Sequence, residues 1–212
     1  MSRFMGILLA LCIALATPRT HAAEQQATIL VFGDSISAGY GIRVEQGWVN
    51  LMAQRIAQTG YGFKVVNASV SGETTAGGLG RLPHALDIQH PQILILELGG
   101  NDGLRSLPLN GTHDNLAQMI RLAQDRHITV LLIGMRLPPN YGERYTSGFQ
   151  KLYADLATQF RVPLVPFLLE PVALKPELMQ EDGIHPTGPA QPMLLDTVWP
   201  RLEPLLKPAA HH

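Results

Sequence analysis

The stretch VFGDSISAGYG, residues 31–41, carries an apolar run directly into an acid, a serine and a cluster of small residues. An apolar, β-branched run that ends at Gly and Asp is typical of a buried strand that gives way to a turn. Ser35 at this turn has two interpretations. It is either a nucleophile at the end of a strand or the cap of the helix that follows, and the rest of the chain must decide between them.

Five short apolar runs alternate with amphipathic segments along the chain. The runs lack polar alternation, as expected of strands covered on both faces, and comprise residues 28–32, 63–66, 93–98, 128–135 and 162–167. The clearest helical stripe is Leu116, Met119, Ile120 and Ala123, which we expect Thr112 or Asp114 to cap. The alternation predicts an α/β fold with a five-stranded parallel sheet between two helical layers.

The first residues predict a secretory signal peptide. Arg3 precedes an apolar run that is too short to span a membrane, and small residues lead to Ala22, so we expect residues 1–22 to be removed. This cleavage would also remove Cys12, the one cysteine of the chain. We expect residues 23–212 to form a single domain in the periplasm or outside the cell, without a stable membrane anchor. The formal net charge of −1 and the lack of a basic cluster argue against a nucleic-acid partner.

Each predicted strand is followed by an unusual cluster of residues. The clusters are GDS after the first strand, NASVSGETT (67–75) after the second, GGNDG (99–103) after the third, RLPPNYGERY (136–145) after the fourth, and EDGIHP (181–186) beyond the fifth. Ligands of open parallel sheets bind at the edge formed by the carboxyl ends of the strands. All five clusters are therefore expected at one edge.

A serine at this edge needs a base, and the base needs a group that fixes its tautomer. His84, His90 and His127 precede strands and are expected at the opposite edge, whereas His113 and His185 are candidates. His185 is favoured because Asp182, three residues earlier, can reach one ring nitrogen across a tight turn. The simpler interpretation is that DGIHP is only a surface turn.

An oxyanion needs donors that are fixed in advance. The backbone N–H groups of Ser35 and Gly72 and the side-chain amide of Asn101 are the candidates, although SVSG and GGND can equally be ordinary turns. Asp34 is predicted to hold its loop by accepting backbone N–H bonds, and Asp102 to be structural.

These motifs resemble, in order and spacing, the four blocks of the SGNH (GDSL-type) serine hydrolases. Ser35, Gly72, Asn101 and His185 match the residues that name the family, and Asp182 matches its triad acid. The stretches LGGNDGLR, RLPPNYGERY and LKPELMQEDGIHP resemble the periplasmic acyl-CoA thioesterase, lysophospholipase and arylesterase branch. The resemblance spans residues 27–206. It implies a flavodoxin-like three-layer α/β/α sandwich without a cofactor or metal, and an esterase and thioesterase that acts on small acyl esters or thioesters through an acyl-enzyme.

The substrate side of the site is less defined by the sequence. Leu104, Leu137, Pro138 and Tyr141 are candidates for an apolar acyl groove, and equally for ordinary loop packing. Residues 75–80, TAGGLG, are richer in glycine than expected of the thioesterase branch, where this segment is interpreted as a loop that moves over the acyl chain.

Three rival functions remain at this point. A phosphate- or flavin-binding module would leave Asp182 and His185 unexplained, and the G-x-x-x-x-G-K-[ST] motif is missing. A metal-dependent hydrolase would use Asp34, Asp182 and His185 but lacks H-x-H and H-E-x-x-H spacing. A carbohydrate deacetylase would use the same triad with a more polar, open cleft.

Overall fold

A computed structural model describes residues 26–207 of the chain, and the predicted signal peptide lies outside them. The described chain is built on one parallel five-stranded sheet with the order β2-β1-β3-β4-β5. Its strands are β1 (Ala27–Gly33), β2 (Phe63–Asn67), β3 (Ile93–Glu97), β4 (Thr129–Ile133) and β5 (Leu164–Val165). This is the flavodoxin-like strand order, so the predicted α/β/α sandwich is confirmed.

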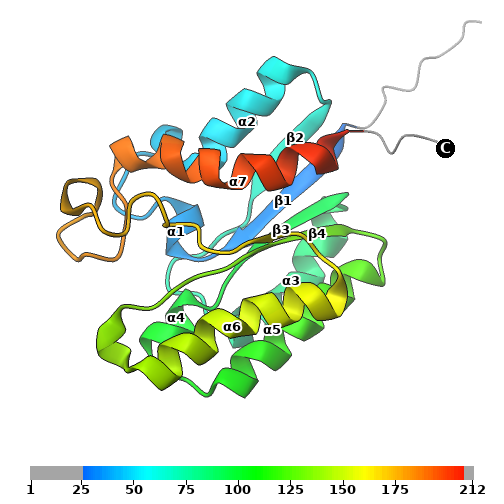
Figure 1. Cartoon of the computed structure of the whole chain (residues 1–212). Helices are drawn as coiled ribbons and strands as arrows, with labels where there is room; N and C mark the ends of the chain where they lie inside the picture. Colours follow the sequence, from blue (N-terminus) through cyan, green and yellow to red (C-terminus); the bar gives the residue numbers. More distant parts are fainter. Residues whose placement is uncertain (1–25, 208–212) are drawn as a thin grey trace, which may run out of the picture.

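Helices cover both faces of the sheet (Figure 1). Helices α2 (Trp48–Thr59) and α7 (Gln191–Leu206) pack against each other on one face. The other face carries α3 (Thr75–Gln89), α5 (Leu109–Gln124) and α6 (Glu143–Phe160). The short helices α1 (Ser35–Ala38) and α4 (Gly100–Leu104) follow β1 and β3 directly. Single 3₁₀ turns occur at η1 (Val44–Gln46), η2 (Pro139–Tyr141), η3 (Pro176–Leu178) and η4 (Gly188–Ala190).

The fifth strand is shorter than the apolar run predicted. The run spans residues 162–167, but only Leu164 and Val165 pair with β4. Pro163 and Pro166 flank this pair, and proline has no N–H to continue a ladder. The strand therefore ends after two residues, and the chain leaves the sheet as the long segment that leads to His185.

The start of one helix also differs from the prediction. Helix α5 begins at Leu109, directly after Pro108, and not at Thr112 or Asp114. Thr112 lies inside the helix, and its buried hydroxyl is 3.4 Å from an oxygen of Asp102. A side chain engaged in this way cannot cap the helix.

The glycine-rich stretch 75–80 is not a loop but the first turns of α3. Thr74 caps this helix, because its hydroxyl accepts a hydrogen bond of 3.2 Å from the N–H of Gly77. A side chain at Gly78 would overlap Leu98 and press on Phe32. The glycine therefore allows close packing of the helix on the sheet, and mobility is not needed to explain it.

The strand order brings two loops together. Strands β1 and β3 are neighbours in the sheet, but the chain continues from β1 to β2 on one side and from β3 to β4 on the other. The loops that follow β1 and β3 therefore run in opposite directions and leave a crevice between them. Such a switch point is where open α/β sheets bind ligands. Among residues 26–207, none of the helices has the length and apolar character that crossing a membrane requires.

Candidate active site

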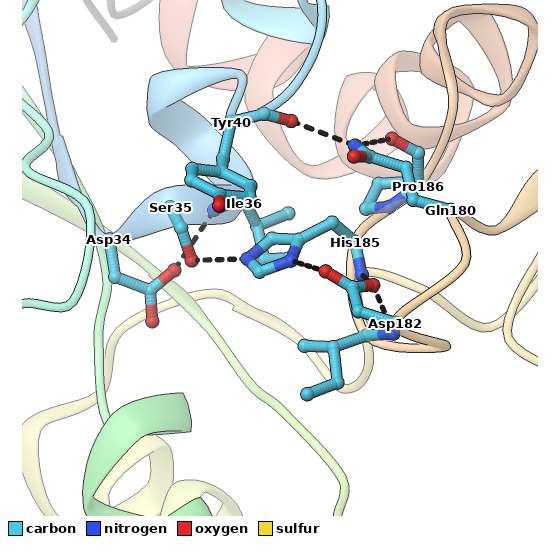
Figure 2. A network of polar contacts seen from close by, with 9 residues as sticks. Asp34, Ser35, Ile36, Tyr40, Gln180, Asp182, His185 and Pro186 are labelled. Carbon is cyan, nitrogen blue, oxygen red and sulfur yellow. Dashed lines mark hydrogen bonds and ion pairs between the residues drawn. The ribbon is translucent and has the colours of Figure 1, made fainter.

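Ser35 is the first residue of α1, at the carboxyl end of β1. The cap of this helix is Asp34 and not Ser35, because Asp34 Oδ1 accepts a hydrogen bond of 3.1 Å from the N–H of Ile36. Asp34 thus accepts a backbone N–H as predicted, and the interpretation of Ser35 as the cap of this helix is wrong. The Ser35 hydroxyl is left free to face His185 (Figure 2).

His185 joins Ser35 to Asp182. Its Nε2 lies 2.8 Å from Ser35 Oγ, and its Nδ1 lies 2.6 Å from Asp182 Oδ2. An Nδ1–H that donates to the carboxylate leaves Nε2 to accept the serine proton. The structure therefore brings together the three side chains that the sequence singled out, although 150 positions separate Ser35 from His185.

The turn between Asp182 and His185 orients the Asp182 carboxylate through backbone hydrogen bonds. Asp182 Oδ1 accepts from the N–H groups of Ile184 and His185 at 2.9 and 3.0 Å, and Gly183 has the positive φ of 66° that the turn requires. Burial opposes the charged form of Asp182, but the hydrogen bonds from His185 and Ile184 outweigh it and lower the pKa to about 2. The carboxylate consequently stays charged at neutral pH.

The predicted oxyanion donors line the same cavity as Ser35. Gly72 has a φ of 78°. In the turn around it, the N–H of Val70 donates to the carbonyl of Gly33, and the N–H of Glu73 donates to the carbonyl of Val70. Arg105 donates to the carbonyl of Gly72 at 3.2 Å, which ties this loop to the end of α4. Asn101 donates one N–H to Asp34 Oδ2 at 3.1 Å and keeps a second.

A buried carboxyl group lies directly behind the Ser35 turn. Glu97, the last residue of β3, is fully buried, and its Oε2 accepts from Ser37 Oγ at 2.6 Å and from the N–H of Asp34 at 3.3 Å. A Cβ on Gly33, its partner across the sheet, would overlap Oε2, which explains the first residue of the GDS motif. Burial raises the pKa of Glu97 well above its ordinary value, and the charge of Asp34 raises it further. Burial likewise raises the pKa of Asp34, to about 6.

Asp102 has a structural position. Its two oxygens accept from the N–H and the hydroxyl of Thr75 at 2.8 and 2.5 Å, and Asn115 donates to the same hydroxyl at 3.1 Å. The Asp102 carboxylate therefore fastens the start of α3 to α4, next to the Gly72 loop.

His113 does not join the site. It lies on α5, and its Nδ1 contacts Asp114 at 3.1 Å. His84 and His90 lie on α3 and at its end, ahead of β3, and His127 precedes β4, so all three are at the amino edge of the sheet. His185 is therefore the better-placed histidine.

A groove of about 650 Å³ opens beside Ser35 and is lined mainly by apolar side chains. Leu104, Leu137 and Pro138 line it, as predicted. Tyr141 is not among the lining residues, and its hydroxyl donates to the carbonyl of Leu104 at 3.0 Å. Further apolar lining comes from residues that the sequence analysis did not single out, namely Met135, Phe167, Leu169, Ala173, Leu174, Met179 and Ile184.

Three polar or aromatic residues of the site were also missed. Glu97 was detectable, since it is the one acid in the apolar run ILILEL. Gln180 and Tyr40 carry no such signal. Their position is set by tertiary structure alone, with the Tyr40 ring 4.6 Å from the His185 ring. Among the described residues, no group of three or more His, Cys, Asp or Glu side chains is arranged to hold a metal ion.

A serine, a histidine and an aspartate linked by hydrogen bonds at the carboxyl edge of a parallel sheet have the geometry of a serine hydrolase. The sequence matches the GDSL-like Lipase/Acylhydrolase family over residues 31–191. The chain therefore belongs to this family, as its resemblance to the SGNH hydrolases predicted.

Several characterised proteins are similar along nearly the whole chain. Esterase TesA of Pseudomonas aeruginosa is 50% identical over 201 residues, which cover 95% of this chain and 99% of that protein. An arylesterase of Vibrio mimicus is 41% identical, with 93% and 96% covered. Thioesterase 1/protease 1/lysophospholipase L1 of Escherichia coli is 42% identical, with 92% and 91% covered. A crystal structure of TesA superposes with a TM-score of 0.82 at 51% identity, over 84% of this chain and 99% of that one.

Proposed function

We propose that the protein is a serine esterase and thioesterase that hydrolyses small acyl esters and thioesters through an acyl-enzyme. The observation that carries this proposal is the continuous chain from Ser35 Oγ through His185 to Asp182, with contacts of 2.8 and 2.6 Å. The names of the similar proteins support the reaction class.

In the first half of the reaction, Ser35 Oγ attacks the carbonyl carbon while its proton passes to His185 Nε2. Asp182 holds the Nδ1–H and stabilises the imidazolium that forms. The tetrahedral intermediate then collapses, the bond to the leaving group breaks, and His185 returns the proton to the departing alkoxide or thiolate. Ser35 is left as an acyl ester.

In the second half, water takes the place of the leaving group. His185 accepts a proton from this water, the hydroxide adds to the acyl carbon, and a second tetrahedral intermediate forms. Its collapse breaks the bond to Ser35 Oγ, which recovers its proton from His185. The carboxylic acid is released and the enzyme is restored.

Both intermediates carry a negative oxygen that needs donors. We assign the N–H of Ser35, the N–H of Gly72 and the second amide N–H of Asn101 to this role. Ser35 N–H is free because the first turn of a helix leaves its N–H groups without intrahelical partners. The Asp34 carboxylate holds the Asn101 amide from the other side.

The groove favours an acyl chain over a sugar. Leu104, Leu137 and Phe167 are among its apolar walls, and its volume of about 650 Å³ suits a ligand of drug or fatty-acyl size. A carbohydrate deacetylase needs hydroxyl-binding groups along an open cleft, which this lining offers less well. The substrate classes we expect are aryl esters, acyl-CoA and lysophospholipids.

We also propose that the mature enzyme works in the periplasm or outside the cell, without a stable membrane anchor and as a single domain. The support is the leader-like sequence that ends at Ala22. Amino-terminal sequencing of the exported protein should begin at Ala23.

The experiment for the reaction is a substrate panel with a matched serine control. p-Nitrophenyl esters from acetyl to palmitoyl, acyl-CoA and a lysophospholipid are tested with the wild type, Ser35→Ala and Ser71→Ala. Ser71 also lines the groove but lies outside the hydrogen-bonded chain. We expect Ser35→Ala to abolish turnover and Ser71→Ala to retain it. Turnover by Ser35→Ala, or loss of turnover in EDTA with recovery in zinc, would contradict the proposal.

A further inference from the structure

The loop that carries Asp182 and His185 lies between the 3₁₀ turns η3 and η4. Its own bonds close it on itself. Met179 and Pro186 form an isolated antiparallel bridge, and Thr187 donates its N–H and its hydroxyl to the carbonyl of Leu178 at 2.8 and 3.1 Å. These contacts shape the loop but do not fix its distance from Ser35, which lies on a different segment.

Gln180 makes a hydrogen bond that crosses from this loop to the segment after Ser35 (Figure 2). Its side-chain Nε2 donates to the carbonyl of Tyr40 at 2.8 Å and to the carbonyl of Pro186 at 3.1 Å. Its backbone N–H donates to the carbonyl of His185 at 2.7 Å, and its carbonyl accepts from the N–H of Gly183 at 2.9 Å. Gln180 thus bonds to residues on both sides of His185 and to the loop that follows Ser35.

The Ser35 side of this contact is adapted to Gln180. Gly41 has a φ of 74°, and a Cβ there would overlap the amide of Gln180, so the missing side chain makes the space that the amide occupies. Tyr40, whose carbonyl accepts the Gln180 bond, also stacks its ring at 41° to that of His185. The Gln180 amide therefore links the backbone of Tyr40, whose ring lies beside the imidazole, to the backbone of Pro186, which follows His185.

We propose that Gln180 is a positioning residue for His185, which sets the distance between the His185 loop and the Ser35 loop through its side-chain amide. This rests on the proposed function, in which His185 is the base. The need is geometric, because proton transfer requires Oγ and Nε2 within hydrogen-bond reach, and a misplacement of about 1 Å can cost about a hundredfold in rate.

The first test compares Gln180→Met with Thr187→Val. Gln180→Met keeps the length of the side chain and removes its donor, whereas Thr187→Val removes a hydrogen bond that stays within the same loop. We expect Gln180→Met to lower kcat about tenfold or more with KM within about twofold, and Thr187→Val to lower kcat less than about threefold. Equal effects on kcat per titrated active site would overturn the proposal.

The second test leaves Gln180 unchanged and displaces its amide. Gly41→Ala and Gly39→Ala both place a side chain at a φ of 74°, where an L residue is strained. Only the Gly41 Cβ would meet Gln180, whereas at Gly39 the nearest atom is 3.6 Å away, on Ile42. Gly41→Ala should therefore lower kcat by at least about fivefold more than Gly39→Ala. Equal kcat values would count against the role of Gln180.

The third test asks whether Gln180 acts through His185. Residues that act as a unit are strongly non-additive. In an Asp182→Asn background, where the imidazole has already lost its orienting carboxylate, Gln180→Met should cost less than about threefold. If the fold-losses in kcat of Asp182→Asn and Gln180→Met multiply in full in the double variant, Gln180 does not act through His185.

Ser35→Ala is measured in the same series. If it retains turnover, the proposed function itself fails. If it is inactive while Gln180→Met behaves like Thr187→Val, only the role of Gln180 fails.

Discussion

Asn101 is the donor whose role can be separated most cleanly from its contribution to the fold. Asn101→Ala removes the side-chain amide of a residue that lines the groove, and one N–H of this amide donates to Asp34 Oδ2 at 3.1 Å. If the second N–H binds the oxyanion, its bond forms mainly in the transition state. Loss of one such donor costs about 10² to 10³ in kcat, or about 2.7–4 kcal/mol, with little change in KM.

The same substitution has a calculable effect on stability. It removes a hydrogen bond to the Asp34 carboxyl group, and bonds to charged groups contribute about 1.5–3 kcal/mol. Asp34 keeps its bond from the N–H of Ile36, so the helix cap survives. For a chain of this size, each kcal/mol lowers Tm by about 2–4 °C, which predicts a loss of about 3–12 °C and a protein that still folds.

The assay measures kcat per active site titrated with a fluorophosphonate, KM and Tm on one preparation. Asn115→Ala is the matched control, because the Asn115 amide is also partly buried and donates to Thr75 Oγ at 3.1 Å, away from the groove lining. We expect this control to lose thermal stability while kcat stays within about threefold. An Asn101→Ala protein that melts early yet turns over normally per titrated site would refute the oxyanion assignment.

Three further predictions concern the base, its orienting acid and the buried carboxyl group. His185→Ala should lower kcat at least about 10³-fold and His113→Ala less than about tenfold, and the reverse ranking in steady-state assays would reject the triad. Asp182→Asn should lower kcat by about 10⁴ while circular dichroism stays native, since the wrong tautomer faces Ser35; near-normal kcat would exclude a tautomer-fixing role. Glu97 has a folded pKa above its ordinary value of 4.5, so the unfolded chain loses this proton first and the folded state weakens as pH rises. The Tm of Glu97→Gln relative to wild type should therefore increase from pH 5 to pH 8, and a constant difference would contradict this.

The strands and the turn that joins Asp182 to His185 were predictable because local chemistry determines them. Short apolar runs without polar alternation specify buried strands, and the turn of Asp182, Gly183 and His185 closes through its own backbone. The residues of the buried strands and of this turn can therefore be identified by their spacing along the chain. The family resemblance added the order in which the motifs occur.

Other features depend on contacts that spacing does not reveal. The length of β5 depends on two prolines, and the helical state of residues 75–80 on the packing of Gly78 against Leu98 and Phe32. Tyr141 was a candidate for the groove, with ordinary loop packing as the alternative, and its hydroxyl instead donates to the carbonyl of Leu104. The partners of Gln180 lie up to 140 positions away, so its role follows only from the tertiary structure.

Covalent labelling of the nucleophile tests the central claim most directly. Wild-type protein treated with a fluorophosphonate should gain the mass of one adduct, and peptide mapping should place it on Ser35, because that hydroxyl lies 2.8 Å from the ring nitrogen of His185. Ser71→Ala should label at the wild-type rate and Ser35→Ala should not label. No adduct on a folded wild type that hydrolyses esters, or an adduct on any other serine, would contradict the account.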